Sequence, residues 1–139
     1  MKKKILAVDD ESSARFLLDL MLRDKFAVET SADSRSALEK AGKKLFDLVL
    51  MDINLGNSES GVTTMKRLRE IKEYENVPVI AVTAFAMAKD KKDLLNEGFN
   101  EYLSKPFERD ELIKLIEKTL NTYSSKLKNE SQSFSPGLD

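Results

Sequence analysis

The sequence predicts an α/β fold in which one parallel β-sheet lies between two layers of helices, a (βα)5 three-layer sandwich. Strand-like segments alternate with amphipathic helix patterns along the 139 residues, and this alternation specifies a parallel sheet. Two of the strand segments, Ile5–Val8 and Leu48–Met51, are continuous apolar runs, as expected for strands that are covered on both faces. Both runs end in carboxylates, at Asp9, Asp10 and Asp52. Reactive groups gather at this edge of such sheets.

A helix is predicted directly after the first strand, because apolar residues recur there at helical spacing. These residues are Ala14, Leu17, Leu18, Met21 and Leu22. Ser12 is the expected N-cap of this helix. Phe26–Thr30 is the second predicted strand, and the helix that starts at Ser34 is expected to stop after Ala41, at Gly42.

The middle of the chain repeats the same pattern. The strand Leu48–Met51 leads into a loop and then into a helix with an apolar side made of Val62, Met65, Leu68 and Ile71. Pro78 marks the start of the fourth strand, Val79–Val82, because proline is tolerated at the first position of a strand.

Two further elements complete the five units. Met87–Glu97 is a predicted helix, with Met87, Leu94 and Leu95 as its buried side. Glu101–Leu103 is the fifth predicted strand. The last helix has a buried stripe of Leu112, Leu115, Ile116 and Leu120. Among the aromatic residues, we interpret Phe16, Phe26, Phe46 and Phe107 as core.

We expect one domain over residues 1–123 and a polar, frayed or disordered tail over residues 124–139. The tail is rich in Ser, Lys and Asn and has few residues to bury. Because the residues after Leu120 cannot form a second core, no DNA-binding effector module is expected within this chain.

Composition excludes several kinds of chemistry and partner. With 23 basic and 24 acidic residues the net charge is −1, which leaves no basic surface for direct nucleic-acid binding. The chain has no cysteine and no histidine, so thiol catalysis, disulfides and the usual zinc ligands and general base are absent. No segment approaches the length of a membrane span, and we expect a cytoplasmic protein without membrane contact.

The predicted strand ends carry groups suited to a metal and to phosphate. Asp10 and Asp52, with a backbone carbonyl from the following loop, can supply the oxygen ligands that Mg²⁺ accepts. Thr83 offers a hydroxyl and Lys105 a cation to an oxyanion. Phosphoryl transfer to a carboxylate requires such groups, since it depends mostly on alignment and charge neutralisation.

These residues resemble a known family, the receiver domain of two-component response regulators. The resemblance covers about residues 3–122 and rests on Asp9-Asp10, Asp52, Thr83-Ala84 and Lys105-Pro106, with Tyr102 three residues before the lysine. It implies a flavodoxin-like sheet of order 2-1-3-4-5. It also implies a cis peptide at Lys105-Pro106, which only a proline makes plausible.

The resemblance further implies a phosphorelay function in signal transduction. Asp52 would accept a phosphoryl group from a sensor histidine kinase or a histidine phosphotransfer protein, and Lys105 and Thr83 would contact the phosphoryl oxygens. Mg²⁺ would be held by Asp9, Asp10, Asp52 and the backbone carbonyl of Asn54. Movement of Thr83 would let Tyr102 turn inward and change the contacts made with an unknown downstream protein.

The chain departs from the family pattern in two places. The loop after Asp52 lacks the proline common there and is about one residue longer, which affects metal geometry and docking. Phe85 lies two residues past Thr83, near the expected path of attacking water, and we therefore expect a long-lived phosphoaspartate.

Two alternative functions stay open. A phosphohydrolase of the haloacid dehalogenase type also uses an aspartate after an apolar strand, but it needs a second aspartate where this chain has Asn54. The missing general acid argues against turnover of small substrates, so we do not expect an enzyme in that sense. A degenerate receiver that acts only as an interaction module is disfavoured because the chain keeps Asp10, Asp52, Thr83 and Lys105.

Overall fold

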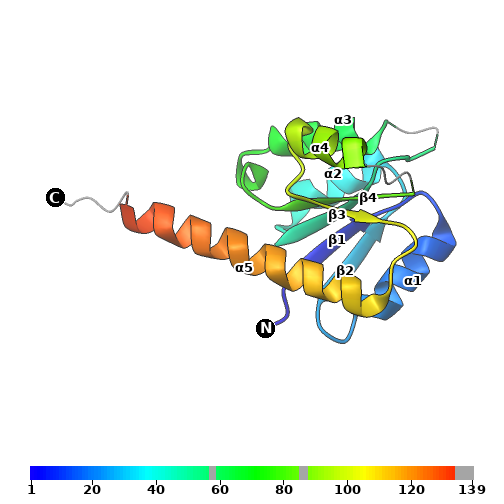
Figure 1. Ribbon diagram of the computed structural model, residues 1–139, viewed down its shortest axis with the longest axis horizontal. Coiled ribbons are helices and arrows are strands. Elements are labelled where there is room, and N and C mark those ends of the chain that lie inside the picture. The colour runs from blue at the N-terminus through cyan, green and yellow to red at the C-terminus, as the bar shows by residue number, and fades with distance from the viewer. Residues whose placement is uncertain (57–58, 85–87, 134–139) are drawn as a thin grey trace.

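The computed structural model describes residues 1–56, 59–84 and 88–133, and over these ranges five parallel strands form one sheet (Figure 1). The strands are β1 (Lys4–Val8), β2 (Ala27–Ser31), β3 (Leu48–Asp52), β4 (Val79–Thr83) and β5 (Glu101–Ser104). Their order in the sheet is β2-β1-β3-β4-β5. The predicted α/β sandwich and its strand order are therefore confirmed.

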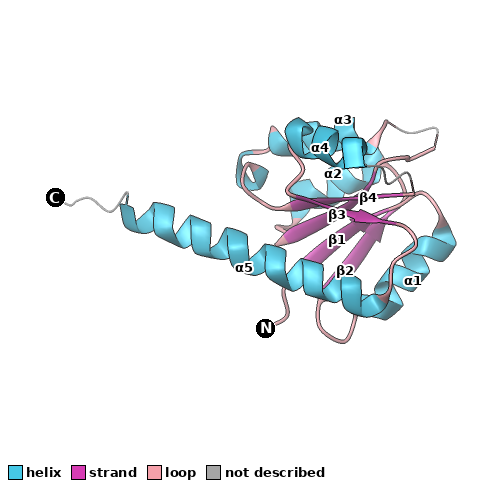
Figure 2. Ribbon diagram, in the orientation of Figure 1, coloured by secondary structure: helices cyan, strands magenta, loops and turns pink. Residues whose placement is uncertain are grey.

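Helices cover both faces of the sheet. They are α1 (Ser12–Leu22), α2 (Ser34–Lys43), α3 (Gly61–Arg69), α4 (Ala88–Glu97) and α5 (Arg109–Ser133), with a short 3-10 helix η1 (Lys72–Tyr74). Figure 2 shows α2, α3 and α4 on one side and α1 and α5 on the other. Alternate strand residues point to opposite faces, so Leu6 and Val8 join one core cluster while Ile5 and Ala7 join the other.

The register of the strands brings the predicted site residues to one edge of the sheet. Val8 of β1 lies opposite Met51 of β3, so the residues that come next, Asp9 and Asp52, are neighbours. Thr83 of β4 lies opposite Ser104 of β5, and Lys105 follows directly. Parallel strands all end at the same edge, and the apolar runs stop there.

Helix α1 turns most, but not all, of its predicted apolar side toward the sheet. Leu18 and Leu22 are buried, whereas Phe16 is 63% exposed and Leu17 is 51% exposed. The interpretation of Phe16 as core is wrong. Successive helix residues are about 100° apart, so Phe16 lies about 200° from Leu18, on the solvent side.

Two helix boundaries differ from the sequence prediction. The N-cap of α1 is Glu11 and not Ser12, and it makes no side-chain capping hydrogen bond. Helix α2 continues through Gly42 to Lys43. A glycine ends a helix when it adopts a positive φ, and the positive-φ glycines in the described residues are Gly56 and Gly98.

The last two helices, α4 and α5, also differ from the sequence prediction. Leu95 of α4 is 38% exposed although it was expected to be buried, and Met87 lies outside the described residues. Helix α5 continues past Tyr123 to Ser133 and projects beyond the sheet (Figure 1), where a frayed or disordered tail was expected. Residues 109–133 contain neither glycine nor proline, the two residues that most strongly disfavour a helix interior. The division of the chain at residue 123 stays a prediction.

In the part of the chain that the structure describes, none of the helices combines the length and the apolar character that crossing a membrane requires.

Candidate functional site

Three carboxylates meet at the carboxyl edge of the sheet. One oxygen from each of Asp9, Asp10 and Asp52 lies within 4.8 Å of the others. Asp9 and Asp52 are buried and Asp10 is exposed. Strands β1 and β3 are neighbours in the sheet, which is why residues far apart in the sequence form this cluster.

Lys105 supplies the positive charge of the site. Its Nζ lies 2.8 Å from Oδ2 of Asp9 and 3.3 Å from Oδ2 of Asp52. The Lys105 backbone N–H donates to the carbonyl of Thr83 over 2.8 Å, which fixes the start of the lysine to the end of β4. The Lys105-Pro106 peptide is cis, as the resemblance implied.

The charges in this cluster are not balanced. Burial raises the pKa of the Asp52 carboxyl and the charge of Asp9 adds to the rise, against the opposing effects of the Asn54 N–H and of Lys105. Burial by itself lowers the pKa of Lys105, but its hydrogen bond to Asp9 and the charge of Asp52 outweigh this, and the pKa is raised. The cluster thus holds three carboxyl groups and one ammonium group, which contacts Asp9 and Asp52.

The donor set fits a hard divalent cation. All three side chains offer carboxylate oxygens, and Mg²⁺ binds through one or two carboxylates while keeping several waters. The exposed Asp10 leaves the cluster open to solvent, so that water can complete the coordination. The three carboxylates carry more negative charge than Lys105 can neutralise, and a bound divalent cation would neutralise the remainder.

The loop after β3 is held against Asp52. The backbone N–H of Asn54 donates to Oδ1 of Asp52 over 3.1 Å, and the Asn54 side-chain oxygen accepts from the N–H of Gly56 over 3.2 Å. Leu55 is buried in the core. This arrangement places Asn54 beside the carboxylates, where its carbonyl was expected to serve as a metal ligand.

The two expected switch residues lie on neighbouring strands. Thr83 is the last residue of β4 and is buried, one position past Val82, which lies opposite Asp52. Tyr102 of β5 lies opposite Ala81 and packs, half-buried, on the core cluster beneath α2, α3 and α4. Phe85 lies outside the described residues.

Two residues of the site were missed in the sequence analysis. Arg15 of α1 donates through Nη1 to the backbone carbonyl of Asp9 over 2.9 Å; nothing in the sequence marks this arginine. A Cβ on Gly61 would lie 2.1 Å from the backbone oxygen of Asp52. The position of Gly61 at the end of a loop that contains one other glycine, Gly56, was the only available signal.

An apolar groove adjoins the carboxylates between α1 and the segment after β5. It encloses about 490 Å³ and is lined in part by Leu17, Met21, Pro106 and Phe107, with Asp9 and Lys105 at its polar end. The exposed Phe16 and Leu20 of α1 lie on the same helix. Such exposed apolar surface beside a polar site is typical of a protein-binding surface.

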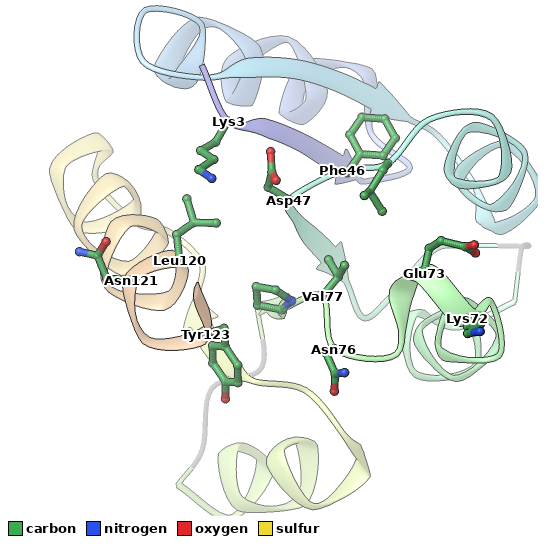
Figure 3. Close-up of a pocket in the computed structure, with 12 residues that line it drawn as sticks. Lys3, Phe46, Asp47, Lys72, Glu73, Asn76, Val77, Leu120, Asn121 and Tyr123 are labelled. Atoms are coloured by element: carbon green, nitrogen blue, oxygen red, sulfur yellow. The ribbon is translucent and has the colours of Figure 1, made fainter. Parts of the chain in front are cut away.

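A second hollow lies at the opposite edge of the sheet, where strands begin. It has a volume of about 430 Å³. Its lining includes Lys3, Asp47 and Pro78, which precede β1, β3 and β4, and Leu120 of α5 (Figure 3). It is separated from the carboxylates by the length of the strands. It therefore does not belong to the candidate site.

Comparison with known proteins agrees with this geometry. The family model described as the response regulator receiver domain matches residues 5–117. An uncharacterized 14.6 kDa protein of Leptolyngbya boryana is 38% identical over 114 residues, which is 81% of this chain and 86% of that protein. The signal transduction histidine-protein kinase BarA of Escherichia coli is 36% identical over 113 residues, which is 81% of this chain and 12% of BarA.

A similar fold is found among solved structures. The chemotaxis protein CheY4 of Vibrio cholerae is similar with a TM-score of 0.81 and 32% identity, over 86% of this chain and 99% of that chain. The match thus extends over nearly the whole of CheY4. In BarA it is confined to a small part of that protein.

Proposed function

Because the chain belongs to the response regulator receiver domain family, we propose that it accepts a phosphoryl group on Asp52 and acts in two-component or phosphorelay signalling. The observation that carries this proposal is the surroundings of Asp52: its carboxylate lies 3.3 Å from Nζ of Lys105 and belongs to the cluster with Asp9 and Asp10. The proposed donor is a phosphohistidine on a sensor kinase or a histidine phosphotransfer protein.

In the proposed reaction an oxygen of Asp52 attacks phosphorus, and the phosphorus–nitrogen bond to the donor imidazole breaks. Lys105 neutralises charge on the equatorial oxygens and Thr83 donates its hydroxyl to one of them. The raised pKa of Asp52 does not prevent attack, because the neighbouring ammonium and the Asn54 N–H favour the ionised form. The product is an acyl phosphate, and the chain does not turn over small substrates.

Asp9, Asp10 and Asp52, with the Asn54 carbonyl, would hold Mg²⁺. The bound ion would supply Lewis-acid neutralisation of the phosphoryl oxygens. Asp9 is fixed for this task, because its Oδ1 accepts from the Glu11 N–H over 3.0 Å and its Oδ2 accepts from Lys105.

The function is tested by the intact mass of the chain after incubation with Mg²⁺ and acetyl phosphate. A single phosphoryl adduct that disappears when Mg²⁺ is chelated is expected. Continuous release of inorganic phosphate without an adduct would instead favour a phosphohydrolase or a very short-lived phosphoaspartate. Neither adduct nor release would favour a degenerate interaction module.

We propose that the donor protein docks on the groove beside α1. Leu17→Glu is expected to slow phosphotransfer from a histidine-kinase transmitter about tenfold, the size of effect seen when an apolar anchor is lost from an interface. Phosphorylation by acetyl phosphate should not change. The rates are measured with both donors, using a transmitter that phosphorylates the wild-type chain.

Leu45→Glu is the matched control for docking. Leu45 is 53% exposed and Leu17 is 51% exposed, but Leu45 lines the hollow at the opposite edge. Equal slowing by both variants, or slowing with acetyl phosphate as well, would contradict docking at the groove.

We propose that Thr83 and Tyr102 transmit the phosphorylated state. Phosphorylation adds charge and acceptor oxygens, which draw the Thr83 hydroxyl inward and leave room for the half-buried Tyr102 to turn toward the core. The surface formed by α4, β5 and α5 then changes, and a downstream protein reads it. We also propose that the chain acts in the cytoplasm, which fractionation of cells that express it checks, and that it makes no direct contact with nucleic acid, which a DNA-binding assay checks.

Tyr102→Ala is expected to leave phosphoryl adduct formation unchanged and to remove the phosphorylation-dependent change at that surface. The change is measured as the difference in amide hydrogen exchange of residues 99–120 with and without beryllofluoride, a phosphoryl mimic. The same difference in wild type and variant would exclude the tyrosine from the switch.

A further inference from the structure

The loop after β3 approaches Asp10 more closely than a side chain allows. Gly56 has a φ of +64°, and a Cβ built on it would lie 2.8 Å from Oδ2 of Asp10. Real Cβ atoms do not make contacts this short. The observed positions of the loop and of the Asp10 carboxylate are therefore compatible only with glycine at residue 56.

A side chain at residue 56 would displace Asp10 and not the loop. Asn54 anchors the loop through its N–H to Asp52, and the Gly56 N–H donates to the Asn54 side chain. Leu55, between them, is 2% exposed and packed in the core. Asp10 is exposed, so its carboxylate is the group with room to move into another rotamer.

We propose that Gly56 is a positioning residue for the cation site. Its missing side chain lets the Asp10 carboxylate stay beside Asp9 and Asp52 while the loop stays against Asp52. The inference rests on the proposed function, because it assumes that these carboxylates hold a divalent cation. It assigns a role in metal affinity to a residue that offers no ligand atom from a side chain.

Gly56→Ala is expected to weaken Mn²⁺ binding by about 10- to 100-fold, the range for residues that orient a metal ligand. Mn²⁺ is a suitable probe because it prefers the same oxygen ligands as Mg²⁺. Its binding is measured from the electron paramagnetic resonance signal of the free ion, without any phosphodonor. Gly42→Ala is the control, since a Cβ there meets nothing within 4 Å, and its Mn²⁺ affinity should equal that of the wild type.

Backbone strain at the positive φ needs a separate measurement, because alanine is strained there whatever the space. A double-mutant cycle with Asp10→Ala removes this effect: both Gly56→Ala proteins carry the strain, but only one retains the carboxylate that the new Cβ meets. In the same Mn²⁺ measurement, the loss of affinity caused by Gly56→Ala should be smaller in the Asp10→Ala background.

The outcomes separate this inference from the proposed function. Weakened Mn²⁺ binding together with a coupled cycle supports the role of Gly56. Unchanged Mn²⁺ binding in Gly56→Ala, or an additive cycle, overturns it while the cation site stands. A wild-type chain that binds no Mn²⁺ overturns both the cation site and the positioning role.

Discussion

Asp52→Asn is expected to abolish the phosphoryl adduct that the wild-type chain forms with acetyl phosphate and Mg²⁺. The amide replaces the nucleophilic carboxylate oxygen and removes a ligand from the cluster with Asp9 and Asp10. Asparagine keeps the size of the side chain, so the fold should stay intact. Intact mass under identical conditions measures the adduct directly.

Asp33→Asn is the matched control for this loss. The Asp33 side chain caps α2 by accepting from the Ser36 N–H over 2.8 Å, and asparagine caps helices equally well. This variant should therefore form the adduct at the wild-type level. An adduct on Asp52→Asn would show that another residue is the phosphoacceptor.

The same Asp52→Asn variant should be more stable than the wild type at neutral pH without metal. The folded-state pKa of Asp52 is raised from 3.8, so the folded chain holds this proton more tightly than the unfolded chain does. The stability contributed by the protonated carboxyl is present below pH 3.8 and is lost as the pH rises through the raised pKa. Asparagine does not titrate and avoids this loss.

Urea unfolding in the presence of a chelator tests this expectation at pH 3, below the ordinary carboxyl pKa of 3.8, and at pH 7. The advantage of Asp52→Asn over the wild type should be larger at pH 7. A variant that is less stable than the wild type at pH 7 would contradict the raised pKa and would indicate that the contact of Asp52 with Lys105 stabilises the fold.

Lys105→Met is expected to slow adduct formation by about 10²- to 10³-fold, the usual cost of removing one group that stabilises oxyanion charge. It should also destabilise the metal-free chain by about 3 kcal/mol, the lower end for breaking a buried ion pair. The Asp9 side chain is 2% exposed and loses its cation at 2.8 Å. The rate is measured by intact mass and the stability by urea unfolding.

Lys25→Met is the control for the loss of a lysine. Lys25 lies 3.8 Å from Glu117 and both side chains are 50% exposed, so the change should cost less than about 1 kcal/mol and leave the rate unchanged. An adduct rate in Lys105→Met that matches the wild type would remove Lys105 from the proposed mechanism.

The convergence of the site residues could be predicted because it follows from two properties of the sequence. Apolar runs that end in polar residues mark the ends of buried strands, and parallel strands end at one edge. Asp9, Asp52, Thr83 and Lys105 were placed by this argument, and the register of the sheet makes Asp9 and Asp52 neighbours. The roles of these residues in phosphorylation stay predictions.

The exposure of Phe16 and Leu17 on α1 could not be predicted from the same pattern. Apolar residues occur nearly all around this helix, at Phe16, Leu17, Leu18 and Leu20. Periodicity therefore identifies Leu18 as buried but does not separate it from the neighbouring Leu17. Packing on the sheet buries Leu18 and leaves Phe16 and Leu17 exposed, and Leu17 lines the groove beside the carboxylates.

The sequence by itself determined the parallel sheet, the order of its elements and the residue types at its carboxyl edge, because these depend on local patterns of apolar and polar residues. Only the tertiary structure decided that Lys105 bridges Asp9 and Asp52, that an apolar groove opens beside them, and that Gly56 lies against Asp10. The reason is that these contacts join residues far apart in the chain. Their distances depend on the packing of α1 and on the path of the loop after β3, and no local pattern encodes either.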